Sequence, residues 1–100
     1  MYNPHMSNTS TLSTKSKQIL KGQAHSLNPV VTIGVKGLTA NVINEIDVAL
    51  EAHQLIKIKC AKLEKSQHQK LVDTICEQCN AQFIQAIGNI IVIYRKRIST

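Results

Sequence analysis

The sequence has few aromatic residues, no paired cysteines and no long apolar run. Its three aromatic residues, Tyr2, Phe83 and Tyr94, leave a chain that is 43% apolar with an aliphatic core. Three cysteines are an odd number and make no disulfide framework, which indicates a reduced, cytoplasmic protein. No apolar run could cross a bilayer, and the first residues lack the layout of a signal peptide. We therefore expect neither a secreted disulfide scaffold nor a membrane protein.

Acidic residues are also missing from both ends of the chain. The formal net charge is +6, and all six acids lie between Glu45 and Glu77. Charge of one sign raises the local concentration of polyanions, among which nucleic acid is the commonest partner. A merely soluble alkaline surface would have the same composition, so charge by itself leaves both readings open.

One hundred residues predict a single domain, and we expect a monomer. Residues 1–11 are small and polar without a pattern, which predicts disorder. We place the domain at residues 12–97 and a short tail at 98–100.

The first half of the domain predicts a helix, a strand and a second helix. Apolar residues at helical spacing favour a helix from Ser13 to Ser26, which Asn28-Pro29 would end. Residues 30–33 are all β-branched, three of them aliphatic, and predict a short buried strand. Thr39 is suited to cap a helix whose inward face would run from Val42 to His53.

The second half predicts a strand, a helix and a hairpin. Residues 55–60 alternate, with Lys57 and Lys59 on one face, so that face is at least locally free of an apolar cover. Ser66 and Gln69 have the spacing of a capping box, and Asn80 suits the end of the helix that follows. Gly88-Asn89 predicts a type II′ turn between two strands. The order α-β-α-β-α-β-β predicts an α/β fold with a four-stranded mixed sheet and helices packed on it.

Two of the four glycines, Gly34 and Gly37, enclose Val35 and Lys36 between the first strand and the second helix. Amides at the start of a helix, with a lysine beside them, can bind a phosphate. A G-x-x-G pattern is weak evidence, because a plain strand-to-helix turn has the same form. The lysine and the charge asymmetry favour phosphate binding here. The G-x-x-x-x-G-K-[ST] pattern of a nucleotide-binding loop is absent.

The remaining chemistry-bearing residues predict no catalytic or metal site. Cys76 and Cys79 have a C-x-x-C spacing, but zinc usually needs two such pairs and only Cys60 remains. Both lie on an apolar helical stripe, so we expect buried structural thiols. The histidines form no triad with a serine or cysteine, and we expect no enzyme activity, no cofactor and no metal.

The segments KGQAHSLNPVV, IGVKGLT and ALEAHQLIKIK, with the closing GNIIVIYR, resemble the CRM domain, or YhbY-like, family of RNA-binding proteins over residues 12–97. The resemblance implies a two-layer α/β fold similar to the C-terminal domain of translation initiation factor three. It also implies an RNA-contacting loop at residues 34–37. The single copy is similar to stand-alone bacterial members, which implies a partner in precursors of the large ribosomal subunit.

We therefore expect a non-enzymatic protein that binds ribosomal RNA or its precursor during large-subunit assembly. The expected RNA-binding residues are those of the loop and the basic side chains that would extend its surface: Gly34, Val35, Lys36, Gly37, Lys15, Lys17, Lys21, Lys57, Lys59, Arg95 and Arg97. With so few aromatics, we expect folded RNA to be recognised by its shape. The alternative is an adaptor that docks on assembly factors through the acidic helix at residues 39–53.

Overall fold

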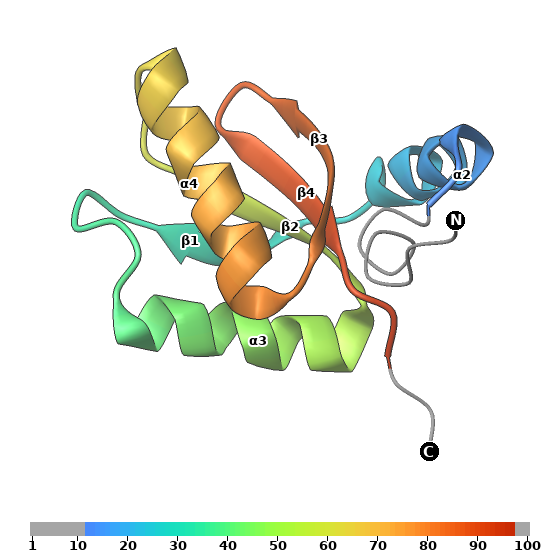
Figure 1. Ribbon diagram of the computed structural model, residues 1–100, viewed down its shortest axis with the longest axis horizontal. Helices are drawn as coiled ribbons and strands as arrows, with labels where there is room; N and C mark the ends of the chain where they lie inside the picture. The colour runs from blue at the N-terminus through green and yellow to red at the C-terminus, as the bar shows by residue number, and fades with distance from the viewer. Residues whose placement is uncertain (1–11, 98–100) are drawn as a thin grey trace, which may run out of the picture.

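The computed structural model describes residues 12–97, with three helices and four strands (Figure 1). The elements are α2 Thr14–Ala24, β1 Pro29–Ile33, α3 Ala40–His53, β2 Leu55–Cys60, α4 Lys65–Cys79, β3 Gln82–Ile87 and β4 Ile90–Tyr94. The predicted order of elements is confirmed. The predicted disordered segment 1–11 and the tail 98–100 lie outside the described residues.

The sheet is mixed, as predicted, with the strand order β1-β2-β4-β3. Strands β1 and β2 are parallel because α3 crosses over between them, and the other two pairs are antiparallel. Gly88 has a φ of +58°, and Asn89 is not among the residues with positive φ. A positive φ at the first loop residue alone fits the predicted type II′ turn.

Most helix ends lie where the sequence places them. The Thr39 hydroxyl accepts a bond from the amide of Val42 at 3.2 Å, and Asn80 adopts the left-handed conformation that ends α4. The predicted capping box at Ser66 and Gln69 is wrong. Helix α4 begins two residues earlier, and the amide of Glu64 donates to Oε1 of Gln67 at 3.3 Å. The same spacing occurs at Glu64 and Gln67, with glutamate in place of serine as the cap residue.

Two apolar clusters lie on opposite faces of the sheet. Helices α3 and α4 cover one face, where Ile46, Leu50, Val72 and Ile75 pack on isoleucines of the strands. His53, predicted on this inward face, is exposed at the end of α3. The core among the described residues is aliphatic, as predicted.

Helix α2 covers only one end of the opposite face, where Ala24 packs with Leu55, Ile84 and Val92. Lys59 lies on this face beyond the helix and is exposed, while Lys57 is half-buried. The predicted local gap in the apolar cover is confirmed at Lys59. The two-layer arrangement thus consists of the sheet with α3 and α4, and α2 adds a partial third layer.

Candidate nucleic-acid interface

The chain leaves β1 in a tight turn that protrudes at one end of the molecule (Figure 1). The amide of Gly37 donates to the carbonyl oxygen of Gly34 at 3.0 Å, which places Val35 and Lys36 at the corners of a β-turn. Gly37 has a φ of +75°, where an L side chain is strained. The turn itself therefore requires glycine at position 37.

Gly34 has no such conformational reason. Its φ is not positive, and a Cβ built on it would meet no atom within 4 Å. Neither the backbone path nor the packing of the protein therefore requires glycine at position 34. What its missing side chain does provide is open access to the backbone from outside.

The amides of this segment are partly used within the protein. The Gly37 amide closes the turn, and the Val42 amide is bonded to the cap residue Thr39. Helix α3 begins at Ala40, so two residues separate the turn from its first amides. The predicted anion pocket therefore lacks the Gly37 amide. Within residues 12–97, no acceptor is recorded for the amides of Val35 and Lys36.

A second loop, which follows β2, lies beside the turn. The amide of Ala61 donates to the carbonyl oxygen of Ile33 at 3.1 Å, which ties the ends of β1 and β2 together. The two loops enclose a hollow of about 160 Å³ to which Lys62 contributes. Lys62 was missed as a site residue, although it belongs to a basic run that continues directly from a strand ending at this edge.

Lys59 belongs to the same end of the sheet, because it pairs with Thr32, two residues before Gly34. The structure thus brings the predicted loop together with Lys59 and adds Lys62. Lys57 lies two residues further from the loop along β2, opposite Pro29.

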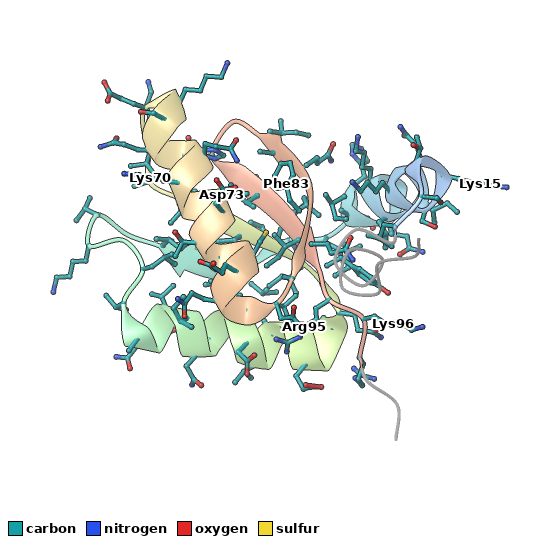
Figure 2. The ribbon with its side chains drawn as sticks, viewed as in Figure 1. Lys15, Lys70, Asp73, Phe83, Arg95 and Lys96 are labelled. Atoms are coloured by element: carbon teal, nitrogen blue, oxygen red, sulfur yellow. The ribbon has the colours of Figure 1, made fainter. Side chains whose placement is uncertain are left out.

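The two predicted arginines lie at the other end of the sheet, next to Gln54. The Arg95 guanidinium is 2.7 Å from the Asp47 carboxylate and donates to the carbonyl oxygen of Cys79 at 2.9 Å. Its side chain is 18% exposed and lies against α3 (Figure 2). Arg97 donates to the carbonyl oxygens of Glu51 and Ala52. Arg97 therefore satisfies carbonyl oxygens in the last turn of α3, and Arg95 joins Asp47 of α3 to the last residue of α4. This geometry gives both side chains a structural role.

The predicted lysines of α2 are remote from the turn. Helix α2 and the turn lie at opposite ends of the long axis of the molecule, and Lys15 projects from the outer part of that helix (Figures 1 and 2). Lys17 lines a hollow with Gln69, Asp73 and Phe83 of the neighbouring elements. Lys15, Lys17 and Lys21 therefore lie apart from the loop, at the other end of the molecule.

Burial makes the thiols poor nucleophiles and poor ligands. Desolvation raises the pKa of Cys76 to about 11, and the Asp73 carboxylate adds to the rise. Burial likewise raises the pKa of Cys60 and of Cys79. In the part of the chain that the structure describes, no three His, Cys, Asp or Glu residues are grouped to hold a metal ion. No helix within residues 12–97 is both long and apolar enough to span a membrane.

The family can be decided by comparison with known proteins. The model of the CRS1 / YhbY (CRM) domain matches residues 12–95. The chain belongs to the CRM-domain family.

Two curated relatives each align with 85% of this chain. A Haemophilus influenzae protein named as an RNA-binding protein is 49% identical over 85% of this chain and 86% of its own length. A Pseudomonas aeruginosa protein, named as a probable RNA-binding protein, is 36% identical over 85% of this chain and 82% of its own. These names assign RNA binding to the relatives and do not mention an enzyme activity.

A solved structure confirms the fold. The solution structure of a Staphylococcus aureus protein, described as a hypothetical RNA-binding protein, superposes with a TM-score of 0.77 at 34% identity. The match covers 88% of this chain and 92% of that one. The α/β architecture is therefore shared with that solved structure.

Proposed function

We propose that this CRM-domain protein is a non-enzymatic, cytoplasmic RNA-binding protein that acts in assembly of the large ribosomal subunit. The turn at residues 34–37 contacts backbone phosphates, and Lys59 and Lys62 extend the contact along the ends of β1 and β2. The bound RNA is large-subunit ribosomal RNA or its precursor, within a pre-ribosomal particle.

One observation carries the proposal. Gly34 leaves backbone open to the outside where the fold does not need glycine, and it lies in a turn with one exposed lysine and two more on neighbouring segments. Phosphate contacts of this kind fix the position of a protein on RNA and carry little sequence information. Basic side chains on strands and loops suit the recognition of folded RNA by shape.

The other basic residues predicted to bind RNA lie away from the turn or are bonded within the protein. RNA at the turn reaches the α2 lysines only if it extends along the long axis of the molecule. Arg95 and Arg97 contribute through stability, because their guanidinium groups are bonded to α3. Lys57 lies at the edge of the surface formed by the turn, Lys59 and Lys62.

Gly34→Ala tests the proposal, because the added methyl group meets no protein atom and leaves the fold intact. If a phosphate approaches this backbone, the methyl group displaces it and weakens a charge-assisted bond, so affinity should fall by about tenfold. Binding to a transcript of precursor large-subunit RNA is measured by fluorescence anisotropy. Gly22→Ala on α2, where a Cβ also meets no atom, is the matched control and should leave affinity unchanged.

In lysate, the wild-type protein should sediment with particles that precede the large subunit and leave them at high salt. Equal affinity of Gly34→Ala and wild type would contradict contact at the turn. Sedimentation only at the top of the gradient would contradict the ribosomal partner.

A second candidate function is favoured by a hollow of about 450 Å³ beside α3 and β1. Val30, Val31, Glu45 and Val48 contribute to its lining, which contains no lysine or arginine. An adaptor that binds basic assembly factors would use this side of the acidic helix. The carboxylates of Asp47 and Glu51 lie 2.7 and 3.7 Å from the Arg95 guanidinium. Glu45 is therefore the acid of α3 that would pair with a basic partner. A partner that stays bound in nuclease-treated lysate and is lost with Val48→Asp would favour the adaptor.

A further inference from the structure

The hollow between the two loops is a small, mainly apolar cavity. Its walls come from the turn after β1, from the loop after β2 and from α4: Ile33, Gly34, Val35, Gly37, Cys60, Ala61, Lys62, Leu63 and Leu71. Its volume of about 160 Å³ is roughly half of the smallest usual small-molecule site, about 300 Å³. It would hold about five water molecules, or one ring system.

The chemistry of the walls matches a flat apolar group with a charged attachment. The walls are apolar, with the thiol of Cys60 among aliphatic side chains, and Lys62 is the charged residue of the lining. Val35 and Leu63, one from each loop, are large apolar side chains that remain 95% and 38% exposed. A ligand in the hollow would remove part of this apolar surface from water, which favours an apolar ligand.

We propose that this hollow binds one unpaired nucleobase of the RNA whose backbone passes the turn. The inference rests on the proposed function and deepens it. The faces of the base lie against the aliphatic walls, the Lys62 ammonium pairs with the phosphate of the same nucleotide, and the open backbone at Gly34 admits the strand.

This geometry selects a class of RNA. A base within a continuous duplex cannot leave the stack without loss of pairing, whereas a bulged or looped base is already unstacked. The preferred RNA is thus a duplex or hairpin with an unpaired nucleotide. Shape places the backbone on the turn, and the extruded base supplies the contact that distinguishes one position from the rest of the helix.

The cavity has little means to identify the base. The amide and thiol of Cys60 both donate to the carbonyl oxygen of Asn89, and the amide of Ala61 is used by Ile33. The donors of these two residues are therefore unavailable to a base edge. We expect the cavity to accept different bases, as apolar and stacking contacts do.

Three hairpins that differ at one nucleotide test the inference. One carries a bulged uridine, one the same bulge without its base, and one is fully paired. At one salt concentration, wild-type protein should bind the uridine bulge about fivefold or more tightly than the abasic bulge. The abasic bulge keeps the phosphates and the bend, so the ratio isolates the base.

Ala61→Leu fills the cavity without a change of charge, and it should bring the ratio to about one. Ala52→Leu, at an exposed position on α3, is the matched control and should keep the wild-type ratio. Leu63→Ala removes one wall of the cavity at a part-exposed position. It should lower the ratio of uridine-bulge to abasic-bulge affinity and leave the packing of the core unchanged. Circular dichroism of each variant checks the fold.

The outcomes separate the two proposals. Binding of all three hairpins with equal affinity, weakened by Gly34→Ala, overturns the base cavity and leaves RNA binding at the turn in place. An unchanged ratio in folded Ala61→Leu or Leu63→Ala also overturns the cavity. Absence of binding to the hairpins and to precursor RNA overturns the proposed function, and the inference with it.

Discussion

Lys36 offers the sharpest test of where the RNA backbone lies. It stands at a corner of the turn and is exposed, so Lys36→Gln removes a charge without a change in packing. A protein that neutralises phosphates releases counterions, and each contact contributes about 0.7 to 0.9 to the slope of log affinity against log salt. Loss of one contact should lower the slope by that amount, and Lys36→Glu should lower it by about one unit or more.

The size of the effect follows from the slope. Between 50 and 200 mM salt, a slope smaller by 0.9 reduces the ratio of wild-type to variant affinity by about 3.5-fold. If Lys62 contacts the same strand, the double replacement of Lys36 and Lys62 by glutamine should reduce this ratio by about tenfold. If the slope changed only because the net charge of the protein fell, replacement of any exposed lysine would change it equally.

Lys96→Gln is therefore the control. It removes the same charge from an exposed residue at the end of the sheet where Gln54 and Arg97 meet, away from the turn. Filter binding of precursor RNA from 50 to 300 mM salt gives the three slopes. Equal slopes for Lys36→Gln and wild type, or an equal loss in Lys96→Gln, would refute the reasoning.

The remaining predictions concern stability and thiol chemistry. Arg95→Ala removes the bonds to Asp47 and Cys79 and should cost about 1–3 kcal/mol, a fall in Tm of roughly 5–15 °C, without a change in the salt slope of RNA binding. Arg95→Lys should restore little, because an ammonium cannot replace the guanidinium fork; full recovery in a thermal melt would argue against this role. The raised pKa of Cys76, about 11 against 9.0, should make its alkylation at pH 7.5 about a hundredfold slower than in unfolded protein, with a rate that climbs as pH rises toward 11. Rapid labelling of the native thiol, followed by mass spectrometry, would contradict the burial.

Local signals in the sequence predicted the elements well, because their causes are local. Thr39 and Asn80 act on amides and carbonyls within one helical turn, and alternation in residues 55–60 identifies the two faces of a strand. The capping box was misplaced by two residues, since the same spacing occurs twice at the start of α4. His53 was misplaced because helical periodicity does not say where the covering layer stops.

The composition of the site depended on contacts that periodicity cannot express. Arg95 and Lys62 both read as basic residues in basic runs. Strand pairing places Arg95 beside Gln54, where the carboxylate of Asp47 and a carbonyl from α4 lie within bonding distance. It places Lys62 beside the turn, through the bond that joins Ala61 to Ile33.

By itself the sequence determined the aliphatic core, the order of the seven elements and the presence of a glycine-bounded turn with a lysine. Each of these depends on residue type and on the spacing of residues that are close together in the sequence. Only the tertiary structure decided which cations share an end of the sheet, that Gly37 serves the turn while Gly34 does not, and that two loops enclose a cavity. The difference between the glycines comes from the backbone angles of the turn, which residue types alone do not give. The shared cations and the cavity arise from parallel pairing of β1 with β2, which brings together segments nearly thirty residues apart in the chain.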